Sequence, residues 1–277
     1  MKLFNRFGRI LIISLLLLFG FIEFYYSITD LSSNWYWIIL AILYTTIIND
    51  IFCHRIVSHY MFKIDVKTWT YKILCFLSSI DLGYGPVRLT VLTHQLHHIH
   101  ADKGPEDVMN WRHWWYATTI VSPLPGINRP EVSEKYIEKI NRVYKNIVDD
   151  KWTKFCHKNS VIISGLSLLF LFLFLPIIFF KIFCMGRFLL TVMTGLAGFF
   201  GHIKNFPGSY RNYNTDDTSS NNLIFHYMFF GLFAGMLQNN HHGKPKSLKP
   251  NNKWYEIDTS YFIVLFLKYM MKEQTAK

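Results

Sequence analysis

The sequence predicts an all-α integral membrane protein, with four transmembrane helices in two hairpins under a cytoplasmic helical cap that carries a histidine-rich metal site. Three observations lead to this prediction. Of the 277 residues, 51% are apolar and only 17% are charged, which excludes a disordered chain. The apolar residues gather into blocks of membrane-spanning length. Most of the histidines gather into groups beside those blocks.

The first two apolar blocks predict a transmembrane hairpin. A hydrocarbon core of roughly 30 Å needs about 20 helical residues. The first block covers about 10–28, and no small-residue cleavage site follows it, which favours an uncleaved span over a signal peptide. The second block covers about 35–53, and the connector 29–34 contains no Lys or Arg. The tip of this hairpin is therefore expected on the non-cytoplasmic side.

The third and fourth blocks, about 160–180 and 182–202, predict a second hairpin whose tip holds Lys181, Gly186 and Arg187. Pro176 is expected to kink the first helix of this pair. The apolar run 73–82 is too short to span and predicts a buried or interfacial helix. The segments 54–159 and 203–277 then lie in the cytoplasm with both termini, in one domain over 1–277. The membrane would be the endoplasmic reticulum or the plasma membrane, depending on the host.

Charge and cysteine usage agree with this topology. The net charge of +11 comes from 29 basic and 18 acidic residues. The basic residues concentrate in the segments assigned to the cytoplasm, as the positive-inside rule expects, so the basic excess does not indicate a nucleic-acid partner. The four cysteines are widely spaced, which indicates neither a disulfide framework nor a zinc ribbon.

Histidine spacing is the strongest chemical signal in the sequence. Eight histidines form four groups: His54 and His59; His94, His97 and His98; His202; and His241 with His242. Helical residues at i, i+3 and i+4 share a face, so HQLHH can present three imidazoles to one point, and Gln238-x-x-His-His repeats the spacing with an amide. His54 and His59 are five residues apart, so they either flank one site or bind different metals. In the predicted topology all four groups lie on one membrane face.

Eight imidazoles exceed the ligands that one zinc ion needs, which favours two metals. Imidazole alone does not choose among iron, copper, nickel and zinc. Iron is favoured because oxidation of an unactivated C–H bond in an acyl chain needs a redox metal near the membrane. Asp50, Asp102 and Asp107 either orient imidazole N–H groups or are solvated or salt-bridged.

These residues resemble the motifs of the integral-membrane fatty acid desaturases, specifically the acyl-CoA or delta-9 type. The resemblance rests on the following segments: HRIVSH (54–59), HQLHHIHADKGPED (94–107), WRHWWY (111–116), His202 at the end of the fourth block, and QNNHHGKP (238–245). It implies a di-iron centre held by the histidine boxes and a buried acyl tunnel. The second block would close the tunnel, with Ile38 and Ile42 as candidate wall residues, although apolar residues in a span need no special role.

By this resemblance the protein is an oxygen-dependent desaturase that introduces a cis double bond, at delta-9, into a saturated acyl-CoA or acyl-lipid. O2 is the co-substrate and is reduced to water. Electrons would come from an external donor, cytochrome b5 or a ferredoxin. The other partners expected are the acyl substrate and the lipid bilayer.

Two positions depart from the family pattern. Gln238 stands where the delta-9 type usually has histidine, so it is a possible oxygen ligand or a group behind the ligands. Gly198 stands four residues before His202, where the family commonly has asparagine. Two alternatives therefore stay open: a fatty acid or lipid hydroxylase with the same di-iron chemistry, and a catalytically inactive membrane relative.

Overall fold

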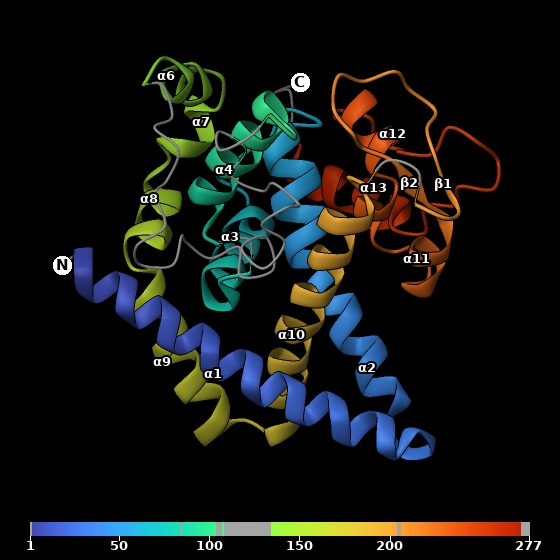
Figure 1. Ribbon diagram of the computed structural model, residues 1–277. Helices are drawn as coiled ribbons and strands as arrows, with labels where there is room; N and C mark the ends of the chain where they lie inside the picture. The colour runs from blue at the N-terminus through green and yellow to red at the C-terminus, as the bar shows by residue number, and fades with distance from the viewer. Residues whose placement is uncertain (1, 84, 104–106, 108–133, 204–205, 273–277) are drawn as a thin grey trace.

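The computed structural model describes residues 2–272, except 84, 104–106, 108–133 and 204–205. The tryptophan-rich motif WRHWWY lies outside the described residues. The chain is mostly helical, and the helices divide into a lower bundle of apolar helices and an upper cap (Figure 1).

The first hairpin is formed by α1 (Lys2–Thr29) and α2 (Leu31–Thr45), which packs against α1. The helix that contains α2 does not end at the predicted residue 53. It continues as a π-helix, η1 (Thr46–Ser58), so that one continuous helical segment runs from the hairpin tip into the cap (Figure 1). The π-helical hydrogen bond joins residues i and i+5, which widens the helix where the first histidine lies.

The second hairpin consists of α9 (Ser160–Phe174) and α10 (Ile177–Phe200), and its turn differs from the predicted one. Pro176 lies in the turn between the two helices and does not kink either of them. Leu175 is extended because the residue before a proline is disfavoured in helical conformation, and α10 begins directly after Pro176. Lys181 and Arg187, expected at the tip, lie inside α10.

The apolar helices indicate an integral membrane protein. Among the described residues, three helical segments are long and apolar enough to span: Leu11–Thr29, Asn34–Ser58 and Ile177–Phe200. A fourth span exists if α8 (Lys151–Lys158) and α9, which meet at a bend of 74°, count as one. Phenylalanine and leucine side chains of α1 and α9 are exposed, as lipid-facing side chains would be.

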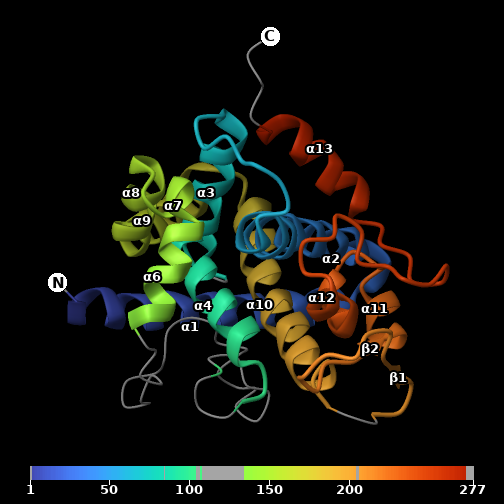
Figure 2. The same ribbon diagram turned by 90° about the horizontal axis from the view of Figure 1, so that it is seen from above.

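The cap is built from two parts of the chain. The first contains α3 (Trp69–Asp81), α4 (Val87–His100), α6 (Glu134–Val143), α7 (Lys145–Val148) and α8. The second contains the antiparallel pair β1 (Ser209–Tyr210) and β2 (Asn221–Asn222), α11 (Leu223–Met228), η4 (Ala234–Met236), α12 (Gln238–Gly243) and α13 (Tyr261–Met271). Seen from above, η1 lies between the two parts (Figure 2).

Two apolar clusters position the elements that carry histidines. One packs η1 against α3, α4 and α13, with Ile51, Phe52 and Val91 among its buried members. The other joins α2 to α10 and to residues 229–236, which lead directly into Gln238. Ile42 is buried in this second cluster and Ile38 is partly buried against it.

Candidate metal centre

Four segments bring the eight histidines of the boxes to one region of the cap. His54 lies on η1 and His59 directly follows it, and the i to i+5 hydrogen bonding of the π-helix places both on one face. Helix α4 carries the second box and α12 the last one. His202 follows the end of α10. The prediction that all four groups meet on one side of the bundle agrees with this arrangement.

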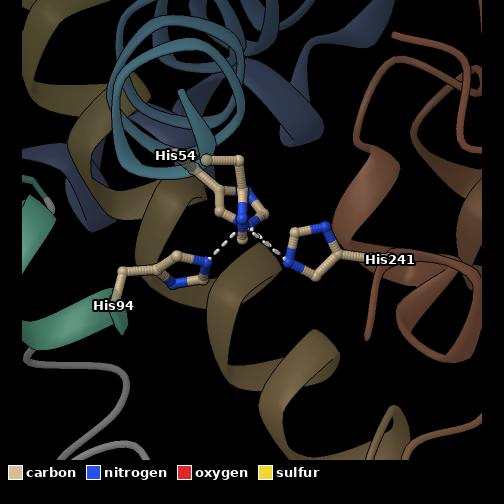
Figure 3. Close-up of side chains that lie close together, drawn as sticks. His54, His94 and His241 are labelled. Atoms are coloured by element: carbon tan, nitrogen blue, oxygen red, sulfur yellow. Dashed lines mark hydrogen bonds between the residues drawn. The ribbon is translucent and has the colours of Figure 1, made fainter. Parts of the chain in front are cut away.

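The first metal-site candidate, called here the first group, is formed by His54, His59, His94 and His241, all buried. In Figure 3 the rings of His54, His94 and His241 point toward a common centre. The Nε2 atom of His241 lies 3.1 Å from Nε2 of both His54 and His59. His94 Nε2 lies 2.7 Å from His59 Nε2. His98 joins this group, with its Nε2 3.1 Å from His94 and 3.0 Å from His241.

The second group consists of His97, His202 and His242, whose ligand atoms also lie within 4.8 Å of one another. Gln238 adjoins it, with its amide nitrogen 3.1 Å from His202 Nε2. The three histidines of α4 therefore do not converge on one point. His94 and His98 face the first group, and His97 faces the second.

Carboxylates hold four of these imidazoles by Nδ1. Asp50 accepts from His54 at 2.8 Å, and Asp107 from His97 at 2.8 Å. Asp102 accepts from His202 at 3.1 Å. Each of the three aspartates singled out in the sequence thus contacts an imidazole nitrogen. A carboxylate on Nδ1–H fixes the tautomer, so that the Nε2 lone pair points into the site.

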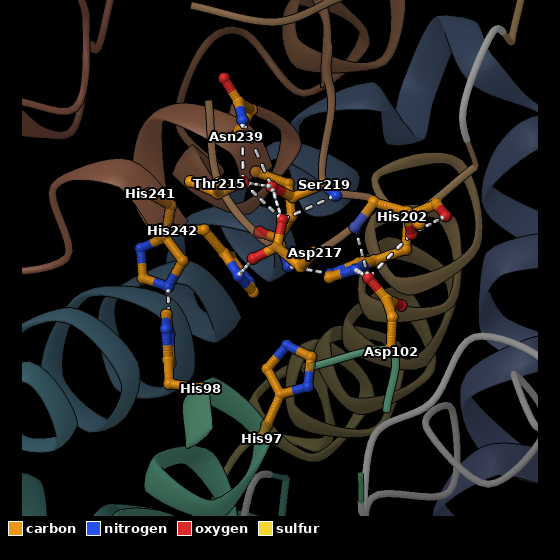
Figure 4. A network of polar contacts seen from close by, with 12 residues as sticks. His97, His98, Asp102, His202, Thr215, Asp217, Ser219, Asn239, His241 and His242 are labelled. Atoms are coloured by element: carbon orange, nitrogen blue, oxygen red, sulfur yellow. Dashed lines mark hydrogen bonds and ion pairs between the residues drawn. The ribbon is translucent and has the colours of Figure 1, made fainter. Parts of the chain in front are cut away.

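The fourth carboxylate, Asp217, was missed by sequence reasoning. It accepts from His242 Nδ1 at 2.6 Å, and from Thr215 Oγ1 at 2.7 Å (Figure 4). Asp217 lies in the polar run 214–222, which has no fixed spacing to any histidine box, so the sequence offers no signal that separates it from its neighbour Asp216.

The environment lowers the pKa of four imidazoles in or beside the first group. Burial, followed by the neighbouring imidazoles, holds the pKa of His59, His94, His98 and His241 well below the ordinary value. These rings therefore present lone pairs and not positive charges at neutral pH.

At two histidines of the second group, His97 and His242, burial and a neighbouring carboxylate shift the pKa in opposite directions. Burial lowers the pKa of His242 to about 4, although the Asp217 hydrogen bond opposes the shift. For His97 burial acts in the same direction, but Asp107 outweighs it and raises the pKa. Burial alone would raise the pKa of Asp102 and Asp217, yet the hydrogen bonds from their histidine partners hold both below the usual range.

The donor set fits metal cations. Two nitrogen ligands at right angles on one ion, each at roughly 2.0–2.1 Å, would be ~2.9 Å apart. The closest Nε2–Nε2 separations of the first group run from 2.7 to 3.1 Å. In the second group, Gln238 Oε1 and His242 Nε2 are buried without a hydrogen-bond partner among the described residues. Buried acceptors of this kind need a partner, and a bound cation would satisfy them.

Asp217→Asn is expected to weaken metal binding at the second group by about 10–100-fold, because an amide cannot hold His242 in the same tautomer with the same strength. Equilibrium competition against a metal chelator measures the change. Asp216→Asn is the matched control, since Asp216 is the exposed neighbour. Equal affinities in the two variants would show that Asp217 does not orient His242.

Fold and site together define the class: a helical integral membrane protein with buried histidine clusters suited to a metal site. No family model matches the chain. It is 25% identical to the sn-1 stearoyl-lipid 9-desaturase of Anabaena variabilis over 220 residues, which covers 78% of this chain and 73% of that protein. It is 26% identical to the protein of the same name from Synechocystis sp. over 216 residues, covering 77% and 62%.

A third relative is the sn-2 palmitoyl-lipid 9-desaturase of Nostoc sp., which is 23% identical over 218 residues, covering 78% of this chain and 71% of that protein. The chain is thus a distant relative of the membrane fatty acid desaturases. The match spans less than two thirds of the Synechocystis protein. All three relatives are named for acyl-lipids, so the comparisons do not support the acyl-CoA type specifically.

Proposed function

We propose that the protein is an O2-dependent acyl-lipid desaturase with a di-iron centre. The first iron would be held by His54, His59, His94, His98 and His241, and the second by His97, His202, His242 and Gln238. The observation that carries this proposal is the convergence of histidine side chains in two adjacent groups, with Nε2 atoms of the first group at metal-ligand spacing. The distant relationship to lipid 9-desaturases supplies the reaction class.

The reaction converts neighbouring methylenes, –CH2–CH2–, into –CH=CH–. O2 accepts the two hydrogens removed from the chain, together with two protons and two electrons from an external donor, and gives two waters. Bound iron would supply the oxidising power that unactivated C–H bonds require. The donor is proposed to be cytochrome b5 or a ferredoxin, and the product a cis double bond at position 9.

The contribution of the protein is orientation and burial. Asp50, Asp102, Asp107 and Asp217 hold imidazole N–H groups, which directs the opposite nitrogens toward the site. Six of the eight box histidines are buried in the described structure: His54, His59, His94, His97, His202 and His241. A site shielded in this way limits water access to an oxidising centre.

The acyl chain is proposed to follow the seam between α2 and α10. The apolar cluster at this seam contains Met185, Met193 and Met236, and it reaches from the middle of the bundle to the segment before Gln238. Flexible methionines suit a surface that accommodates an alkyl chain. Ile42, buried in this cluster, and Ile38 beside it are proposed as the end wall.

Product analysis tests the proposal. The chain is expressed in a desaturase-deficient host, and total fatty acids are analysed by gas chromatography–mass spectrometry. A new monoene is expected, and it should disappear in the double variant His241→Ala, His242→Ala. Ile42→Ala should admit longer chains or shift the double bond if the end-wall assignment holds. A hydroxy acid would replace the desaturase proposal with a hydroxylase, and an iron-loaded protein without product, given donor and substrate, would indicate an inactive relative.

A further inference from the structure

Two buried carboxylates lie close together in the segment 256–258, just before α13. Glu256 is 0% exposed and Asp258 is 5% exposed. Neither belongs to a histidine group. Each one contacts a residue adjacent in sequence to a histidine of the first group: Asn240 precedes His241, and Arg55 follows His54.

Glu256 is surrounded by donors. Its Oε1 accepts from Tyr210 Oη at 2.7 Å and from Asn212 Nδ2 at 2.5 Å. Its Oε2 accepts from Asn240 Nδ2 at 2.9 Å and from the backbone nitrogens of Asn252 and Lys253. Burial alone would raise the pKa of Glu256, but these hydrogen bonds lower it, so the side chain is a carboxylate. Only a carboxylate, which has no N–H of its own, satisfies all five donors.

Asn240 lies on α12 and links Glu256 to this helix. Its Oδ1 accepts from Asn212 at 2.8 Å and from Asn221 at 2.9 Å, and its backbone nitrogen donates to Asn221 Oδ1 at 3.1 Å. Asn240 is 1% exposed. Because the side chain of Asn240 is held by three partners, Asn212, Asn221 and Glu256, the backbone that carries the adjacent His241 is held in place.

Asp258 constrains η1 in the same way. Its Oδ2 pairs with Arg55 Nη2 at 2.9 Å, and both side chains are almost fully buried. Arg55 Nη2 also donates to the carbonyl of Leu248 at 2.9 Å, and Nη1 donates to Ser260 Oγ. The end of η1 that carries His54 is thereby tied to the segment that carries Glu256.

We propose that Glu256 and Asp258 are positioning residues that set the spacing between His54 and His241, and with it the affinity of the first group for metal. The Nε2 atoms of these two histidines are 3.1 Å apart although 187 positions separate them in sequence. The first apolar cluster contains residues of η1 but none of α12, so it does not join the two elements. The segment 256–258 joins both elements through polar contacts. This inference rests on the proposed function.

The test measures metal affinity directly. The purified full-length chain is stripped of metal and titrated with Co(II), whose absorption reports its coordination, in competition with a chelator. Glu256→Gln places an amide N–H against the surrounding donors and is expected to weaken binding at the first group by about 10–100-fold, as loss of outer hydrogen-bonding partners does at other metal sites. Glu138→Gln, on the exposed face of α6, is the matched control.

A double-mutant cycle identifies the route of the effect. If Glu256 acts through Asn240, Glu256→Gln should weaken metal binding less in the Asn240→Ala background than in the wild-type chain. Circular dichroism and size-exclusion chromatography establish that each variant is folded. Should Glu256→Gln fail to fold, Asn240→Ala must still weaken the first group at least tenfold relative to Glu138→Gln for the inference to stand.

The outcomes separate this inference from the proposed function. A wild-type chain that binds two Co(II) ions, together with a folded Glu256→Gln variant that matches Glu138→Gln, overturns the positioning role and leaves the di-iron proposal intact. A wild-type chain that binds no metal overturns the di-iron proposal and this inference with it.

Discussion

His94→Ala is expected to abolish desaturation and to lower the metal affinity of the first group by more than about 100-fold. Loss of a residue that only hydrogen-bonds to a ligand costs up to about 100-fold, and this variant loses a proposed ligand itself. His94 Nε2 is 2.7 Å from His59 Nε2 and 3.1 Å from His98 Nε2, so it lies inside the ligand set. Iron per chain after equilibration with a chelator and monoene formation in a desaturase-deficient host measure the two effects.

His100→Ala is the matched control for this variant. His100 lies on the same helix, is half-buried, and packs the edge of its ring on Tyr136 with ring centroids 5.1 Å apart. It belongs to neither histidine group among the described residues. We expect full iron content and product formation in this control. Two irons and normal product in His94→Ala would contradict the assignment of α4 as a ligand helix.

The sequence predicts the elements that carry the site because histidine spacing on a helix is a local property. The i, i+3, i+4 pattern places His94, His97 and His98 on one face whatever the fold around them. The local sequence does not determine which of these histidines faces the first group and which faces the second. The division depends on how α4 is placed relative to η1 and α12, and no spacing rule within the box encodes that placement.

Two further features depend on tertiary contacts. The π-helix η1 carries buried side chains over almost its whole length, including Asn49, Asp50 and Arg55, so packing and polar contacts from other segments stabilise its wide turns. Asp217 reaches His242 from a loop 25 residues away. Neither feature produces a periodic or compositional signal.

At the second hairpin, a local sequence signal that marks the turn was overlooked. Hydropathy alone places the turn at Lys181, the charged interruption in a long apolar run. Backbone chemistry places it at Pro176, which lacks an N–H and disfavours a helical Leu175. Lys181 instead remains within α10 and pairs with Glu23 of α1, with Nζ and Oε2 3.1 Å apart. In this hairpin the proline, and not the single charge, marks the turn between the two apolar helices.

Gln238 variants are expected to change the second group in a defined order, with metal affinity falling from Gln238→His to wild type to Gln238→Leu. Gln238 Nε2 lies 3.1 Å from His202 Nε2, and rotating the amide by half a turn brings Oε1 to that place. Gly201 permits the approach, because a Cβ atom there would lie 3.0 Å from Gln238 Cβ. The amide oxygen is a weaker ligand than imidazole for iron, whereas leucine offers none.

A Co(II) titration resolves the two groups and checks this order. Between the His and Leu variants we expect a difference of about 100-fold or more at the second group, by analogy with the 10–100-fold that outer partners alone contribute. The first group serves as the internal control, because its member on α12 is His241, whereas Gln238 contacts His202 of the second group. Loss of both titration steps in Gln238→Leu would indicate a misfolded cap. Identical second steps in all three proteins would show that the amide lies outside the coordination sphere, leaving the second metal with three imidazoles and open positions for solvent or O2.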